Sequence, residues 1–124
     1  MKVIITISES ALPIARTIQR EWMDAGIIRM SDCSFLSEHW KELECVIFVG
    51  ALGICVRTIA PLLEDKYTDP AVVCVDSTGR YIIPVVSGHI GGANGSSKRI
   101  AAILGGEAVI TTQSDNLGLW ALDT

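Results

Sequence analysis

The segment from Ser87 to Gly95 contains the residues best suited to chemistry in this chain. It carries His89, one of two histidines, among glycines at positions 88, 91, 92 and 95, and it follows the apolar run Pro84-Val85-Val86. Glycines let backbone N–H groups approach a ligand closely, because no Cβ stands in the way. The following residues, Ser97 to Leu104, have the pattern of a helix, whose amino-terminal end favours anions. The segment therefore predicts an anion site where a strand passes into a helix.

A second strand-to-helix junction is predicted at Gly50-Ala51-Leu52-Gly53, directly after the apolar run Cys45–Val49. In open α/β sheets ligands bind beyond the carboxyl ends of the strands, so two such junctions on one edge would frame a single cleft. Neither junction has the glycine spacing of a dinucleotide fingerprint, and no Gly-Lys-Ser/Thr follows at P-loop spacing. A Rossmann-like nucleotide-binding domain is therefore the weaker alternative.

Length, composition and charge limit the classes of protein that fit. A chain of 124 residues predicts one domain with a single core. Hydrophobic residues make up 49% and aromatic residues only 6%, which favours a parallel or mixed sheet covered by helices. The net charge is −4 and no basic run occurs, which argues against a nucleic-acid partner. An anionic ligand must then be held by local groups.

The cysteines and the apolar segments indicate a cytoplasmic protein without a metal centre. The four cysteines show no Cys-x-x-Cys spacing, and most of them lie in apolar runs, as expected of reduced, buried side chains. They are Cys33, Cys45, Cys55 and Cys74. No apolar stretch reaches membrane-spanning length, and the amino-terminal residues lack the features of a signal peptide. We therefore expect neither a membrane partner nor a bound metal.

Strand and helix patterns alternate along the chain. Strands are predicted at residues 3–7, 27–30, 45–49, 71–75, 80–83 and 108–111. Helical patterns follow Ser10, Ser34, Ala51 and Gly92, and Gly105-Gly106 is a predicted helix stop. The turn composition of Asp76-Ser77-Thr78-Gly79 predicts a β-hairpin. The expected fold is a three-layer α/β/α domain of Rossmann-like or flavodoxin-like type, with a mostly parallel mixed sheet and one hairpin.

Several of these segments together resemble the amino-terminal domain of the CbiG family. The similar segments run from Cys45 to Asp123, whereas the first forty residues share only the layout of strand and helix. The motifs that carry the resemblance are Gly50–Leu63, Lys66, Asp69–Val73, Pro84, Ser87–Asn94, and Val109–Thr112 with Asp115. Members of that family usually continue into a linker and a carboxy-terminal domain. The resemblance implies that residues 1–124 form a single amino-terminal α/β domain that lacks those parts.

The resemblance also implies an activity, because the family comprises cobalt-precorrin 5A hydrolases of anaerobic cobalamin (vitamin B12) biosynthesis. In that reaction a δ-lactone on ring A of the corrinoid is opened and a two-carbon fragment is lost as acetaldehyde. No cofactor is implied, because the cobalt belongs to the substrate. The implied partners are this flat, carboxylate-rich corrinoid and the carboxy-terminal domain of the same protein. An alternative that stays open is a non-catalytic module that binds an anion or docks another domain.

The roles expected of individual residues follow from this reaction and from their chemistry. His89 is the candidate general base, Asp115 the group that orients it, and the N–H groups of Gly91 and Gly92, with Ser87 or Asn94, the candidate oxyanion hole. Arg57 and Lys66 can contact substrate carboxylates. The full set of candidate substrate-binding residues is Gly50, Gly53, Arg57, Lys66, Ser87, Gly88, Gly91, Gly92, Asn94, Thr111 and Thr112.

Three of these assignments have purely structural alternatives. His89 can instead end a strand by bonding to the backbone. Arg57 can be an outward-facing helix residue that pairs with Glu64 or Asp65, a kind of pair that contributes little to stability. Asp69-Pro70 can be no more than a turn before the next strand.

Overall fold

A computed structural model of the chain describes residues 1–22, 24–87 and 92–112. Within them a six-stranded sheet has the order β2-β1-β3-β4-β5-β6. The strands are β1 (Lys2–Thr6), β2 (Ala25–Arg29), β3 (Cys45–Val49), β4 (Ala71–Val75), β5 (Tyr81–Val86) and β6 (Glu107–Ala108). The α-helices are α1 (Leu12–Glu21), α2 (Ser34–His39), α3 (Leu52–Ile59) and α4 (Ala93–Leu104). Short 3₁₀ turns are η1 (Glu9–Ala11), η2 (Met30–Asp32), η3 (Trp40–Glu42) and η4 (Ala60–Leu62).

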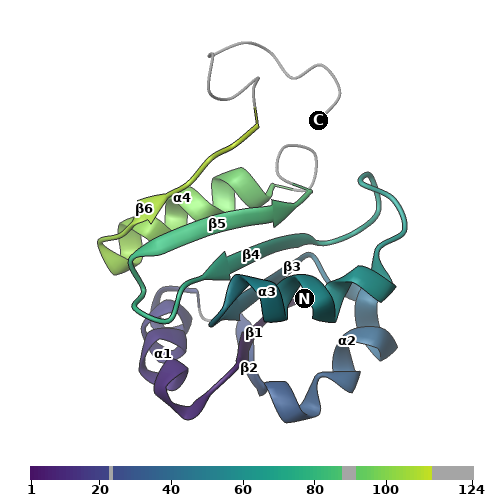
Figure 1. Ribbon diagram of the computed structural model, residues 1–124, viewed down its shortest axis with the longest axis horizontal. Coiled ribbons are helices and arrows are strands. Elements are labelled where there is room, and N and C mark those ends of the chain that lie inside the picture. The colour runs from purple at the N-terminus through teal and green to yellow at the C-terminus, as the bar shows by residue number, and fades with distance from the viewer. Residues whose placement is uncertain (23, 88–91, 113–124) are drawn as a thin grey trace.

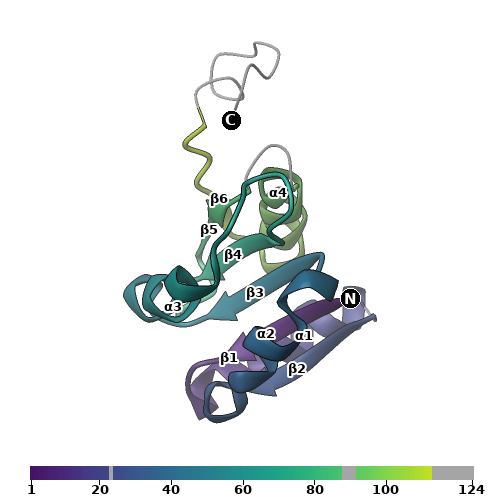
Figure 2. The ribbon, with the colours of Figure 1, turned by 90° about the vertical axis from the view of Figure 1, so that its right-hand side faces the viewer.

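The sheet is mixed and lies between two layers of helices, which confirms the predicted three-layer α/β/α fold. β1 to β4 are parallel, β5 is antiparallel to β4, and β6 is parallel to β5. α1 and α4 pack on one face of the sheet, and α2 and α3 on the other (Figures 1 and 2). We call the end of the sheet where β1 to β4 begin the amino edge, and the end where they finish the carboxyl edge.

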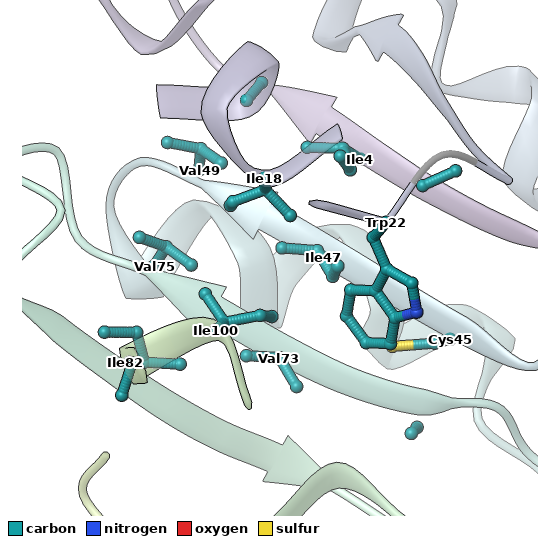
Figure 3. Packing of buried hydrophobic residues seen from close by; sticks show 14 of the residues in the cluster. Ile4, Ile18, Trp22, Cys45, Ile47, Val49, Val73, Val75, Ile82 and Ile100 are labelled. Carbon is teal, nitrogen blue, oxygen red and sulfur yellow. The ribbon is translucent and has the colours of Figure 1, made fainter. Parts of the chain in front are cut away.

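The core follows from apolar strands that are buried on both faces. All five residues of β3 and all five of β4 are buried, as expected for central strands covered by helices. On one face Ile18 of α1 and Ile100 of α4 gather with the strand side chains Ile47 and Val75 (Figure 3). On the other face Phe48 and Cys74 pack with residues of α2 and α3. Burying each large aliphatic side chain contributes about 1.5–3 kcal/mol.

The helix patterns are confirmed, although some ends differ from the prediction. In α4, Ala93, Ser97 and Ile100 form a buried stripe at helical spacing, and Gly105 ends the helix with φ 69°. The N–H of Gly106 bonds to the carbonyl of Ala101 at 2.9 Å, which satisfies a terminal carbonyl. The first helix, α1, ends at Glu21, and β2 begins at Ala25, two residues before the predicted start of that strand.

The last strand is shorter than predicted. A strand was expected at residues 108–111, whereas β6 contains only Glu107 and Ala108. One further bond joins the N–H of Val109 to the carbonyl of Ile82 at 2.8 Å. Beyond that point the Thr112 hydroxyl accepts a hydrogen bond from the side-chain amide of Asn94 in α4.

The predicted hairpin between β4 and β5 is confirmed, and Asp76 organises its turn. The Asp76 carboxylate accepts bonds from the Thr78 hydroxyl at 2.6 Å and from the N–H groups of Arg80 and Tyr81, both at 2.8 Å. Partial burial disfavours the charged carboxylate, but the bonds from Thr78, Tyr81 and Arg80 outweigh that effect, and the pKa of Asp76 is lowered.

Replacing Asp76 by alanine is expected to lower the free energy of unfolding by about 1–3 kcal/mol at neutral pH, because several turn N–H groups lose their acceptor. A lowered pKa means that this stabilisation is present above the usual carboxyl value of 3.8 and is lost as the pH falls through the folded-state value. Urea denaturation at pH 7 and at steps below pH 4 measures it. The difference between the two proteins should shrink in acid; a difference that grows in acid would contradict this assignment.

Candidate functional site

The two glycine-rich junctions lie at opposite edges of the sheet. In the pairing of β3 with β4, Val49 lies beside Val75, and the N–H of Gly50 bonds to the carbonyl of Val75 at 2.8 Å. In the pairing of β4 with β5, Val86 lies beside Val72 at the beginning of β4. Gly50 is therefore at the carboxyl edge and Ser87 at the amino edge, as the opposed arrows of β4 and β5 show (Figure 1). The expectation of a single cleft framed by both junctions is wrong.

At the amino edge the chain passes from β5 to α4 through a constrained backbone. Ser87 has φ 58°, a left-handed conformation that is uncommon for a residue with a side chain. Its carbonyl accepts the N–H of Ala93 at 3.1 Å, and its hydroxyl donates to the carbonyl of Asp69 at 3.4 Å. Gly92, the N-cap residue of α4, has φ 88° and has no side chain with which to cap the helix. The first turn of α4 therefore begins directly beside Ser87.

Asn94 and Thr112 meet at the same edge. The side-chain amide of Asn94 donates to the Thr112 hydroxyl at 2.7 Å, and Asn94 is only 5% exposed. Thr111 precedes this contact and is exposed. One turn further along α4, the fully buried hydroxyl of Ser97 has no hydrogen-bond partner among the residues that the structure describes. Hydrogen bonds at the amino edge thus join three of the motif segments. The first contains Asp69, the second contains Ser87 and Asn94, and the third contains Thr112.

Asp69 does more than form a turn before β4. Its carboxylate accepts the indole N–H of Trp40 at 3.0 Å and the backbone N–H groups of Glu64 and Asp65 at 2.9 and 3.1 Å. These bonds close the loop that carries Lys66, which is exposed and lies 5.5 Å from the ring centre of its neighbour Tyr67. Asp69 therefore fixes the position of that loop against the amino edge.

Replacing Asp69 by alanine is expected to lower the free energy of unfolding by about 1–3 kcal/mol, because the indole N–H of the buried Trp40 loses its acceptor. Chemical denaturation followed by tryptophan fluorescence measures this loss. Glu64→Ala is the matched control, because it leaves the backbone N–H that bonds to Asp69 in place. An equal loss in both variants would show that the Asp69 carboxylate is not the cause.

At the carboxyl edge the candidate residues are spread along α3. Gly50 is buried with φ 150°, and a Cβ there would lie 2.6 Å from Ile7 Cδ1. Gly53 is exposed, and a Cβ there would meet nothing within 4 Å. Arg57 is exposed on α3 and takes part in none of the ion pairs found among the described residues, including the predicted alternative with Glu64 or Asp65. Packing thus accounts for Gly50, whereas Gly53 and Arg57 are open to a ligand.

Four of the candidate residues, Gly88, His89, Gly91 and Asp115, lie outside the residues that the structure describes. The second histidine, His39, is half-buried at the end of α2. Its Nδ1 lies 3.2 Å from a carboxylate oxygen of Glu42, and its ring centre is 4.2 Å from that of Phe35.

The cysteines behave as core residues. Cys45, Cys55 and Cys74 are buried and free, as predicted, and Cys33 is half-buried. Burial raises the pKa of the Cys45 thiol to about 11. The neighbouring Cys74 and burial raise the pKa of Cys55 as well. The thiols of Cys45 and Cys55 are therefore protonated at neutral pH and poorly nucleophilic.

A groove that the sequence alone did not predict lies at the carboxyl ends of β1 and β2. Its volume is about 640 Å³, and its lining includes Thr6, Ser8, Arg16, Arg29 and Ser31. The helical spacing of Leu12, Arg16 and Gln19 places these three side chains on one flank of α1, and this part of the groove could have been predicted from the sequence. The contact of that flank with Arg29 depends on the register of β1 and β2, which the sequence does not specify.

The fold is that of a doubly wound α/β domain of flavodoxin-like strand order, in which glycine-rich segments follow the parallel strand β3 and the antiparallel strand β5. The sequence profile described as "Cobalamin synthesis G N-terminal" matches residues 34–115, and the chain belongs to this family. No helix among the described residues is long and apolar enough to cross a membrane.

Similar proteins agree with this membership. A cobalt-precorrin-5A hydrolase from Salmonella typhimurium is 51% identical over 79 residues, and one from Priestia megaterium is 50% identical over 93 residues. These alignments cover 64% and 75% of this chain but only 22% and 24% of the relatives. The crystal structure of a cobalamin biosynthesis protein G homologue from Sulfolobus solfataricus matches with a TM-score of 0.79 and 30% identity, covering 89% of this chain and 36% of the other. The chain thus spans about a quarter of the length of the curated relatives that it matches.

Proposed function

We propose that this chain is the amino-terminal, substrate-binding part of a cobalt-precorrin-5A hydrolase of cobalamin biosynthesis. The observation that carries the proposal is the convergence at the amino edge, where Asp69, Ser87, Asn94 and Thr112 are linked by hydrogen bonds beside the start of α4. All four positions fall within the region that matches the family. The names of the two bacterial relatives support the choice of substrate.

The amino edge is chemically suited to a carboxylate of the proposed corrinoid. The helix dipole gives the first turn of α4 a partial positive charge, and Gly92 leaves that turn unobstructed by a side chain. Lys66 adds a positive charge on the adjoining loop. The cobalt enters with the substrate, so the proposal assigns no resident cofactor to the chain.

The proposed chemistry consumes one water and releases one acetaldehyde. His89 takes a proton from the water that attacks the lactone carbonyl, since an imidazole titrates near neutral pH. The N–H groups of Gly91 and Gly92 stabilise the resulting oxyanion, and Asp115 orients His89. The oxyanion collapses as the lactone C–O bond breaks, which leaves a carboxylate on ring A and an alcohol on the two-carbon fragment. When that alcohol loses its proton, the C–C bond to the macrocycle breaks, the fragment leaves as acetaldehyde, and the electron pair stays on the macrocycle. In sequence His89 lies between Ser87 and Gly92, two residues of the amino edge, which supports this role.

The proposal includes a second part of the protein, because the matched relatives are about four times as long as the segment that they share with this chain. We propose that a further domain, such as the family's carboxy-terminal domain, completes the enzyme. The proposed location is the cytoplasm, where thiols such as Cys45, Cys55 and Cys74 stay reduced.

Anaerobic equilibrium binding of cobalt-precorrin-5A to residues 1–124 tests the substrate-binding role. We expect saturable binding, and weaker binding of cobalamin, whose arms are amidated and carry no free carboxylates. Equal binding of both corrinoids, or binding of neither, would contradict the proposal. Saturable binding of an unrelated anion alone would instead favour an anion-binding or domain-docking module.

A further inference from the structure

The groove at the carboxyl ends of β1 and β2 is a second candidate site for acidic ligands. It lies at the edge of the sheet opposite to Ser87 and Asn94, and its lining residues fall within positions 6 to 31, before the region that matches the family. We propose that this groove binds a carboxylate-bearing ligand, which Arg29 holds from the floor and Arg16 from the facing wall. The proposal does not depend on the hydrolase assignment.

The floor of the groove is set by the register of the two strands. Thr6 and Arg29 are paired neighbours at the ends of β1 and β2. Side chains alternate along a strand, and Ile4 and Ile27 belong to the core cluster under α1. Thr6 and Arg29, two residues further on, therefore project toward the same α1 side of the sheet. This brings a hydroxyl and a guanidinium together at the floor.

The facing wall is one flank of α1. Leu12, Arg16 and Gln19 lie on that flank, while Ala15 and Ile18 point into the core. The amide of Gln19 donates to the carbonyl of Ala25 at 2.9 Å, which ties this wall to the start of β2. The wall is thus anchored, and Arg16 is held beside the groove rather than on the outer face of the helix.

The charges in the groove favour an anion. Arg16 and Arg29 line it, and among the described residues neither forms an ion pair. Glu9 is the acidic side chain in the lining, so the lining carries a net positive charge of about one. The hydroxyls of Ser8 and Ser31 lie at the ends of the two strands and supply further donors.

The planar donor set of arginine selects carboxylates by two-pronged hydrogen bonding. Two guanidinium groups, one at the floor and one on the facing wall, suit a ligand with more than one carboxylate. Its source can be a free small polycarboxylic acid or an acidic arm of a corrinoid, and the groove volume of about 640 Å³ admits either.

Titration calorimetry of residues 1–124 at low salt tests the proposal with two probes. Tricarballylate represents a free polycarboxylic acid, and cobyrinic acid represents a corrinoid with free carboxylates. We expect one or both probes to bind. Arg16→Gln and Arg29→Gln should each lower the affinity for a probe that binds by about 10-fold to 100-fold, because each removes a charged hydrogen-bonding partner. Binding of tricarballylate alone would identify a small acid as the source, and binding of cobyrinic acid alone a corrinoid arm.

Arg20→Gln is the matched control, because Arg20 is exposed on the same helix but does not line the groove. It should bind the probes as the unmodified chain does. Thermal unfolding of every variant confirms that the fold is retained. The proposal is overturned if neither probe binds, if Arg16→Gln with Arg29→Gln leaves the affinity unchanged, or if Arg20→Gln weakens it equally. Loss of hydrolase activity plays no part in this test, so the two proposals can fail independently.

Discussion

Replacing His89 by glutamine is expected to lower kcat for cobalt-precorrin-5A hydrolysis by about 10²–10⁴-fold, the usual contribution of a positioned general base. Glutamine retains hydrogen-bonding capacity but cannot accept a proton near neutral pH. The effect on substrate affinity should be small, because the proposed carboxylate contacts come from α4 and Lys66. The rate is measured in a chimera in which this chain replaces the matching segment of the Priestia megaterium relative, 50% identical over 93 residues.

His39→Gln is the control for this experiment. His39 is the other histidine, and it lies on the surface of α2 beside Glu42. Its replacement should leave kcat unchanged. If His89→Gln keeps the full rate with bound substrate, His89 is not the base, and the structural alternative, a residue that ends a strand by bonding to the backbone, is the better account.

Replacing Gly50 by alanine is expected to lower the free energy of unfolding by about 2–4 kcal/mol, from backbone strain together with overpacking. The φ of 150° is one that residues with side chains rarely adopt, and the new Cβ would lie 2.6 Å from Ile7 Cδ1 and 2.7 Å from Ile7 Cβ. The backbone on both sides is fixed, because the N–H of Gly50 bonds to Val75 and the N–H of Ile7 to Val49. Urea denaturation of residues 1–124 measures the loss.

The variant Gly53→Ala tests whether this glycine is needed for ligand binding rather than for stability. A Cβ at Gly53 meets nothing within 4 Å, and alanine is favoured over glycine inside a helix by up to about 1 kcal/mol. The variant should be as stable as the unmodified chain or more so. If it nevertheless weakens binding of the corrinoid, Gly53 is a ligand contact. A Gly50→Ala variant of unchanged stability would refute the packing account of Gly50.

The periodicity of the sequence was sufficient to predict the layers of the fold. Helical patterns were predicted after Ser10 and after Gly92, where α1 and α4 bury Ala15 with Ile18 and Ala93 with Ile100. The hairpin was predicted from its turn composition, and Gly105-Gly106 from its position after a helix. These features are local, so neighbouring residues are enough to specify them.

The arrangement of the candidate site depended on long-range pairing, which the sequence does not display. The direction of β5 places Ser87 beside the beginning of β4, and therefore away from Gly50. The groove was missed because Thr6 and Arg29 become neighbours only through the register of two strands far apart in sequence. The hydrogen bonds of Asp69 to Trp40 and Glu64 likewise join separate segments.

The measurement that tests the central proposal most directly is acetaldehyde release from cobalt-precorrin-5A under anaerobic conditions by the chimera. One equivalent of acetaldehyde should be released for each corrinoid consumed, and the same chimera with His89→Gln should release it at least about 100-fold more slowly. A chimera that is folded and binds the corrinoid, yet consumes it without releasing acetaldehyde or does not consume it, would contradict the assignment of this chain to a cobalt-precorrin-5A hydrolase.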